Sequence, residues 1–197
     1  IANATLLATL GPVFTSTISF FQGKKTSRNV YFGLGIALFG IIIIQYGDLS
    51  LSPKNLFGNA LSLLSSFFIA VTFTTAAEIR KDTGNVSYGR TLFLIAAITI
   101  GLIAVISGVS LINFQRDHIP WLLFLGLVPS ILGHNMLNYA LKYFSPTAIA
   151  SVPLGEPIIA SIFGFLIFSE SIPSGAMISA PIILGGIFIV LKYQDTN

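Results

Sequence analysis

The amino-acid sequence predicts an all-α fold, a polytopic transmembrane helix bundle, and its composition is the first reason. The 197 residues are 54% hydrophobic and 9% charged, with a mean hydropathy of +0.87, whereas soluble domains are about a quarter charged. The second reason is that apolar runs such as residues 41–44 do not alternate with polar residues, as strands of a membrane β-barrel would. Because a backbone in hydrocarbon must satisfy its own hydrogen bonds, such runs form helices.

Seven apolar spans are expected, each long enough or nearly so to cross a hydrocarbon core of about 30 Å. Prolines lie at or near the starts of four of them (Pro53, Pro120, Pro146 and Pro173), where a missing N–H group costs nothing. The longest connection, residues 81–89, is polar. The spans are approximately 4–22, 30–46, 56–77, 91–112, 120–141, 147–168 and 174–191.

The basic residues predict an orientation, because eight of the ten lie at alternate span ends. By the positive-inside rule the side with eight is cytoplasmic, which places the C-terminus inside and predicts an integral protein of the plasma (bacterial inner) membrane. The net charge of +3 therefore reports orientation, and the lipid bilayer rather than nucleic acid is the expected partner. The eight are Lys24, Lys25, Arg28, Arg80, Lys81, Arg90, Lys142 and Lys192, and the other two are Lys54 and Arg116.

The chain also contains a weak internal repeat. Superposing residues 12–44 on 157–189 matches identical residues, among them Pro12 with Pro157, and aligns the two span–loop–span patterns. The two copies run in opposite directions, which predicts an inverted repeat with five spans in each unit. Residues 1–47 would then hold the last two spans of an incomplete first repeat, and residues 54–192 a complete second one.

In that arrangement residues 1–22 pack on spans that this chain does not contain. A polar face along Thr5, Thr9 and Ser16 is therefore expected to be exposed.

Three stretches, residues 148–170, 126–142 and 5–47, resemble the EamA-type drug/metabolite transporter superfamily. Residues 148–170 (AIASVPLGEPIIASIFGFLIFSE) resemble the ninth span of that family, residues 126–142 the eighth, and residues 5–47 the fourth and fifth. The resemblance implies ten spans in two inverted five-span repeats, of which this chain would supply the C-terminal seven. It also implies secondary transport of a small metabolite or drug, by export or exchange.

Glu156 is the strongest candidate for a binding or coupling residue. It lies about ten residues into its span, or roughly 15 Å of helix rise, which is close to the midplane. Pro153 and Pro157 remove two N–H groups around it and free backbone carbonyls, while Gly155 leaves room for close approach. A weakened helix with a midplane carboxylate is typical of a transporter's binding site. The alternative is a protonated glutamic acid that only joins two helices.

The fifth span offers a partner for that carboxylate. Ser130, His134 and Asn138 recur four residues apart and form one polar stripe, with Asn135 beside it. His134 lies at nearly the same depth as Glu156, so the two side chains are predicted to form a pair that exchanges protons or binds a substrate amine. The alternative is a histidine that serves packing alone.

Hydroxyl groups of the third span form a further candidate surface, represented by Ser66 and Thr72. The alternative is that these groups bond back to carbonyls of their own helix. Ladders of small residues, such as Gly33, Ala37 and Gly40, are better explained by close helix packing.

The function predicted is therefore that of a permease working by alternating access, with a small-molecule substrate. The chain has no motif of a hydrolase, a metalloprotease or a nucleotide-binding loop, so no enzyme activity, cofactor or metal is expected. Without cysteine it also has no thiolate metal ligand. A seven-helix receptor or a scaffold subunit is the alternative, and the sequence leaves open whether the chain forms a homo-oligomer.

Overall fold

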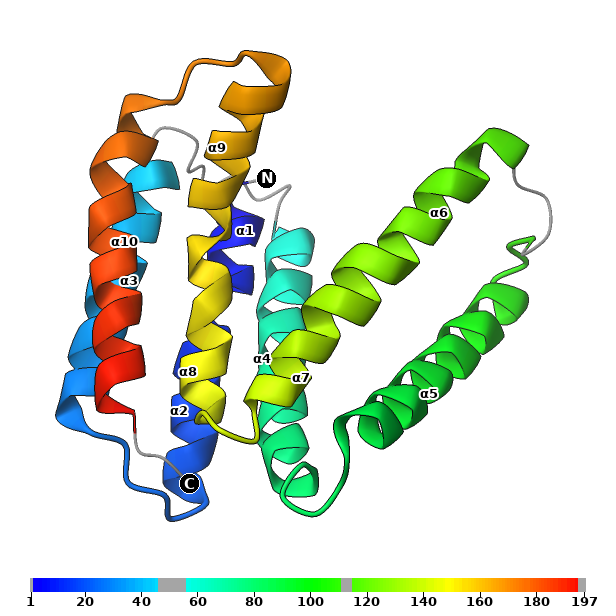
Figure 1. Ribbon diagram of the computed structural model, residues 1–197, viewed down its shortest axis with the longest axis horizontal. Helices are drawn as coiled ribbons and strands as arrows, with labels where there is room; N and C mark the ends of the chain where they lie inside the picture. The colour runs from blue at the N-terminus through cyan, green and yellow to red at the C-terminus, as the bar shows by residue number, and fades with distance from the viewer. Residues whose placement is uncertain (1, 46–55, 111–114, 195–197) are drawn as a thin grey trace. The chain divides into compact units, whose positions relative to one another are not determined.

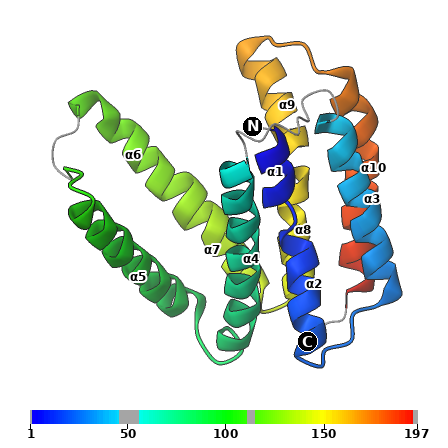
Figure 2. The same ribbon diagram turned by 180° about the vertical axis from the view of Figure 1, so that it is seen from behind.

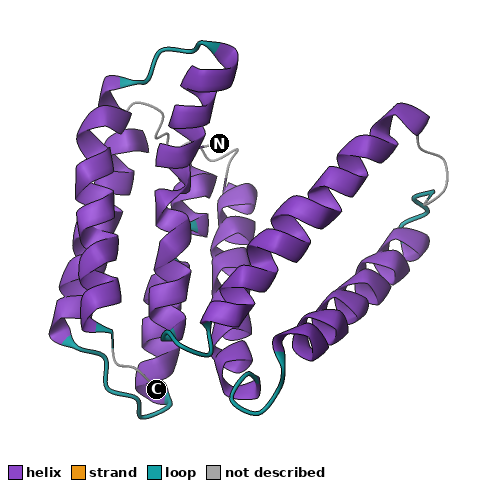
Figure 3. Ribbon diagram, viewed as in Figure 1, coloured by secondary structure: helices purple, strands orange, loops and turns teal. Residues whose placement is uncertain are grey.

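The computed structural model describes residues 2–45, 56–110 and 115–194, and every regular element within these ranges is a helix (Figure 3). The predicted all-α membrane fold is confirmed. Six helical segments of the described residues are long and apolar enough to cross a membrane, and the apolar segment Leu6–Phe21 is shorter. The six are Arg28–Gln45, Leu56–Ile79, Asn85–Ile106, Arg116–Ala140, Pro146–Phe168 and Ser174–Tyr193.

The chain forms two compact units. One comprises Ile1–Thr75 together with Tyr143–Asn197, and the other comprises Ala76–Lys142. Helix α4, Leu56–Ile79, contributes its last turn to the second unit. The predicted repeat boundaries at residues 47 and 54 lie outside the described residues.

The first predicted span, 4–22, is two helices rather than one. Helix α1 covers Ala2–Ala8 and helix α2 covers Gly11–Phe21 (Figure 2). Pro12 lies in the first turn of α2 and has no N–H group for the carbonyl of Ala8, and its ring would clash with that carbonyl in a continuous helix. The proline therefore ends one helix and starts the next.

The core of the first unit is the pair formed by α3, Arg28–Gln45, and α10, Ser174–Tyr193, which lie side by side (Figure 1). Their backbones nearly touch. A Cβ atom on Gly186 would lie 2.5 Å from the nitrogen of Ala37 and 2.6 Å from the carbonyl oxygen of Gly33. The small-residue ladder of α3 therefore serves close packing, as its spacing predicts.

The same unit contains the sixth predicted span in three pieces. These are α8, Pro146–Ser151, a 3₁₀ turn over Val152–Gly155, and α9, Glu156–Phe168. The hydroxyl of Ser145 caps α8 by accepting from the backbone N–H of Ala148. All six residues of α8 are buried, and α8 packs against α2.

That packing overturns the expected exposed face of residues 1–22. Ser16 is only 2% exposed and Thr9 is half-buried, while the side chain of Thr5 lies outside those described. The small residues of α2 let it approach its neighbours within this chain. A Cβ atom on Gly11, for example, would lie 3.9 Å from the carbonyl oxygen of Ser66 in α4. The exposed residues of α2 are instead Val13, Thr17, Phe20 and Phe21.

The second unit contains α5, Asn85–Ile106, and the fifth predicted span. That span consists of a 3₁₀ turn over Arg116–His118, α6 over Ile119–Leu125, a π-helical segment over Gly126–His134, and α7 over Asn135–Ala140. The predicted span 91–112 begins too late, because α5 already starts at Asn85, inside the expected loop 81–89. Hydropathy detects only the apolar part of a helix, whereas α5 starts with polar residues that pack on α7.

Gly186 provides a test of the α3–α10 contact. We expect Gly186→Ala to destabilise the protein by about 1–3 kcal/mol, because the new methyl group meets backbone atoms that no rotamer change can move. Gly185→Ala is the matched control, since no atom lies within 4 Å of a Cβ atom there. It should be neutral or slightly stabilising. Thermal unfolding in detergent measures both, and equal behaviour of the two variants would contradict the backbone contact.

Candidate functional site

The interrupted helix α8–α9 places Glu156. Pro153 offers no N–H group to the carbonyl of Ile149, and Pro157 offers none to that of Pro153. The structure does not leave these carbonyls free. They accept from the N–H groups of Val152 and Glu156 in 3₁₀ geometry. These two backbone carbonyls are therefore hydrogen-bonded, and the polar group that this turn leaves for other partners is the Glu156 carboxylate.

Leu154 anchors this turn to the core of the first unit. Its side chain is 1% exposed and packs with Ala37, Ile41, Ile183 and Ile187 from α3 and α10. A Cβ atom on the neighbouring Gly155 would make only an ordinary contact, 3.8 Å from Cδ1 of Ile187. Gly155 is thus not needed for close packing here, and the position of Glu156 follows from the anchored Leu154.

Glu156 itself is exposed and lies in the first turn of α9. Within the described part of the chain its carboxylate has no ion-pair or hydrogen-bond partner. The N-terminal end of a helix favours a negative charge. A carboxylate facing lipid in the middle of a span would be costly. The side chain therefore requires a polar surface, an aqueous cavity or a solute.

The fifth span differs from the regular helix that its polar spacing assumes. Pro129 has no N–H group for the carbonyl of Leu125, and the hydroxyl of Ser130 donates to that carbonyl at 3.1 Å. Nδ1 of His134 lies 3.0 Å from the carbonyl oxygen of Pro129 and donates to it, which leaves Nε2 as the ring nitrogen that other groups can reach.

The π segment changes the angular spacing of side chains, and π-helical turns occur frequently at functional sites. The three members of the predicted stripe accordingly have different surroundings. His134 is exposed, Ser130 is half-buried and Asn138 is buried. Pro129, in mid-span, is the sequence signal that would have revealed this interruption.

The sequence did not indicate the role of Arg80, which is hydrogen-bonded to the backbone of this stripe at Asn138. Arg80 is 3% exposed; its Nε donates to the carbonyl oxygen of Asn138 at 3.1 Å, and its Nη1 donates to the carbonyl oxygen of Thr83. A guanidinium group can bridge two carbonyls in this way because its donors point in fixed directions. Arg80 thereby ties the end of α4 to α7.

Asn85 and Asn135 complete the same cluster. The side-chain amide of Asn85 donates to the backbone carbonyl of Asn135 at 3.2 Å. A Cβ atom on Gly89 would lie 2.6 Å from Oδ1 of Asn135, so a larger residue there would displace the Asn135 side chain. The Oδ1 atoms of Asn85 and Asn135 are buried without a partner among the described residues. The side chain of Asn135 therefore faces α5. The sequence signal for this cluster was the polar segment, residues 81–89, that precedes the apolar span.

The hydroxyl groups of α4 bond to their own helix. Ser66 is fully buried and donates to the carbonyl of Leu63 at 2.9 Å, while the exposed Thr72 donates to that of Phe68 at 2.8 Å. Each therefore has only acceptor capacity left for other groups.

Glu156 belongs to one compact unit, and His134 and Asn138 belong to the other. Their pairing stays a prediction. Among the described residues, no group of three histidine, aspartate or glutamate side chains is arranged to hold a metal ion.

The chain is similar to known membrane transporters. A family model described as the EamA-like transporter family matches residues 56–192. Two proteins of Archaeoglobus fulgidus, each named an uncharacterized transporter, are 24% and 23% identical over 195 residues, which is 98% of this chain and 67% of each relative. The uncharacterized inner membrane transporter YedA of Escherichia coli K12 is 26% identical over 189 residues, which is 95% of this chain and 60% of that relative.

A solved crystal structure has the same fold. It superposes with a TM-score of 0.76 and 14% sequence identity, covering 95% of this chain and 66% of the other. At that identity the likeness concerns the fold alone.

Arg80 can be tested by substitution. We expect Arg80→Ala to destabilise the protein by about 2–3 kcal/mol, because two carbonyls lose a charged donor in a buried position. Lys81→Ala is the matched control, because the Lys81–Glu78 ion pair is exposed and contributes little. Thermal unfolding in detergent should separate the two variants, and an Arg80→Ala protein as stable as Lys81→Ala would contradict the role of this side chain.

Proposed function

The chain belongs to the EamA-like transporter family and is an integral membrane protein, and from this premise we propose that it forms part of a secondary transporter. The transporter would move a small polar metabolite or drug across the plasma (bacterial inner) membrane by alternating access. The observation that carries the proposal is the interrupted helix α8–α9, which presents the Glu156 carboxylate within a membrane span. No covalent step is involved, so the protein acts as a permease and not as an enzyme.

Glu156 is the residue that we assign to solute binding or coupling. A carboxylate in a span is stable when it faces a cavity, and it then binds a proton, a cation or a solute with N–H or O–H donors. Its position at the start of α9 supports this role, since the helix dipole stabilises the charged form while no side chain of the described residues neutralises it.

His134, Asn138, Asn135 and Ser130 are proposed as further residues of solute binding or coupling. The π segment and Pro129 support a local role for this part of the chain. Of these residues, His134 presents Nε2 to its surroundings, while Asn135 is also engaged with α5. Ser66 and Thr72 are weaker members of the set, because their hydroxyl protons are already donated within α4.

The backbone changes at Pro12, Pro153 and Pro157 support a role in conformational change. At each of these places the helix is broken or tightened while its hydrogen bonds are largely kept. Such places allow a small rotation of one helix piece against the next at low free-energy cost, which alternating access requires.

We further propose that residues 1–47 belong to a first five-span repeat and residues 54–192 to a second, inverted one. The family match over residues 56–192 supports the second unit. The relatives are longer than this chain, which spans 67% of the Archaeoglobus proteins.

Glu156→Gln tests the proposed site in the full-length protein. Solutes that protect the wild type against heat unfolding are first identified, and their transport is then measured in membrane vesicles. We expect Glu156→Gln to lower transport of such a solute by about tenfold or more, because a hydrogen bond to a charged group contributes about 1.5–3 kcal/mol.

Glu170→Gln is the matched control, because Glu170 is exposed in the connection after α9. It should transport normally. Unchanged transport by a well-expressed Glu156→Gln protein would contradict a role of Glu156 in binding or coupling. If no solute stabilises the wild-type protein and none is transported by it, that result would favour the receptor or scaffold alternative.

The proposed orientation, with the C-terminus in the cytoplasm, has its own test. Single cysteines at Lys81 and Asp195 should react only with reagents that cross the membrane, and those at Lys54 and Arg116 with impermeant reagents added outside. The absence of native cysteine makes the labelling specific. Mixed accessibility within either set would contradict the orientation. Lys54 and Asp195 lie outside the described residues.

A further inference from the structure

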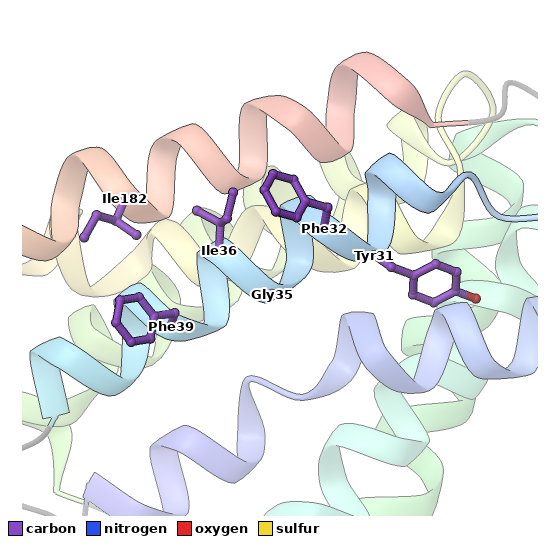
Figure 4. Close-up of a pocket in the computed structure, with 6 residues that line it drawn as sticks. All are labelled: Tyr31, Phe32, Gly35, Ile36, Phe39 and Ile182. Atoms are coloured by element: carbon purple, nitrogen blue, oxygen red, sulfur yellow. The ribbon is translucent and has the colours of Figure 1, made fainter.

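An apolar groove runs along the outer side of α3, next to α10. It has a volume of about 500 Å³. Figure 4 shows Phe32, Ile36 and Phe39 following one another along α3, with Ile182 from α10 beside them. Gly35 leaves the groove open, since no atom lies within 4 Å of a Cβ atom built there. The groove belongs entirely to the first unit and is separate from Glu156.

The end of α3 at which the groove begins has polar and basic residues in and just before it. Among its six lining residues only Tyr31 has a polar side-chain atom, and Tyr31 lies at the end where the chain enters α3 (Figure 4). Arg28, Tyr31, Gly35 and Phe39 recur every three or four residues and therefore share one face of the helix. Arg28 and Lys25 are exposed, and the connection from Gln22 to Ser27 contains no acidic residue.

The length of this face corresponds to one leaflet of a bilayer. From Arg28 to Phe39 the helix rises roughly 16 Å, which is close to half of a hydrocarbon core about 30 Å thick. Tyrosine and arginine are side chains that commonly lie at the boundary between hydrocarbon and headgroups. The groove thus joins an apolar wall one leaflet deep to positive charge at the headgroup level.

We infer that this groove binds an anionic glycerophospholipid. One acyl chain occupies the wall between Phe32 and Phe39, over Gly35, and the phosphate lies against Arg28 and Lys25, with the Tyr31 hydroxyl near the ester region. The bound lipid covers the exposed face of α3 and ties the α3–α10 pair to one leaflet.

Charge complementarity favours a lipid over a second copy of the chain. Two copies in the same membrane have the same orientation, so a symmetric contact through this face would bring the Arg28 and Lys25 side chains of both copies together. Like charges in contact are unfavourable, whereas a phosphate group supplies the opposite charge and a hydrocarbon chain of matching length.

The test uses the full-length protein in neutral detergent, titrated with phosphatidylglycerol or with phosphatidylcholine of the same acyl chains. Native mass spectrometry counts the bound lipids and reports the oligomeric state. We expect one tightly bound phosphatidylglycerol for each wild-type chain and weaker binding of phosphatidylcholine. Gly35→Leu fills the groove and should lose that lipid, while Gly101→Leu, at an equally open glycine of α5, should keep it.

Arg28→Gln tests the headgroup contact without altering the groove. It should weaken phosphatidylglycerol binding about fivefold, which corresponds to one basic residue near an anionic lipid, and leave phosphatidylcholine binding unchanged. Equal binding of the two lipids by the wild type, or full binding by Gly35→Leu, would overturn the inference. So would a wild-type dimer that Gly35→Leu dissociates, because the groove would then be the contact between copies.

Discussion

The backbone contact between α3 and α10 is the constraint on which the first unit depends. Lipid tails are as apolar as leucine, so helices in a membrane gain little from burying apolar surface and associate through close packing instead. Gly33 and Gly186 bring the two backbones together, and the pair then forms one wall around Leu154. Because Leu154 fixes the 3₁₀ turn, the start of α9 and the place of Glu156 follow from a contact made elsewhere in the unit. The opposite face of α3 remains open as the apolar groove.

Prolines interrupt three helical spans among the described residues, and at two of them the freed carbonyls accept from other donors. Pro12 separates α1 from α2, Pro153 is accommodated by a 3₁₀ turn, and Pro129 accompanies a π segment. At Pro129 the Ser130 hydroxyl replaces the missing N–H group. An unsatisfied carbonyl in hydrocarbon costs several kcal/mol. Helices can therefore be irregular in a membrane where such replacements exist, and these places are suited to conformational change.

Arg80 shows that one residue can carry two kinds of information. Its charge contributes to the orientation that the positive-inside rule predicts, and that prediction uses only the charge and its place in the sequence. In the structure its guanidinium group is buried and bridges the carbonyls of Thr83 and Asn138. The residues that keep α4, α5 and α7 together in the second unit thus lie in the polar segments that flank the spans.

The sequence by itself determined the fold class, the approximate place of each span and the resemblance to a transporter family, because hydropathy and residue motifs are properties of the linear chain. It also identified Glu156 and the prolines beside it as unusual for a membrane span. The pairing of Glu156 with His134 stays a prediction.

Only the tertiary structure decided that Ser16 is buried, that α5 begins at Asn85, that Arg80 and Asn85 bind α7, and that Gly186 rather than Gly185 is in contact with α3. Each of these depends on which helix faces meet. In a soluble helix the apolar side reveals the buried face. In a membrane span the lipid-facing side is equally apolar, so hydropathy does not reveal the packed face. A ladder of small residues, as in α3, can indicate it, but which helix packs there is decided by the tertiary structure.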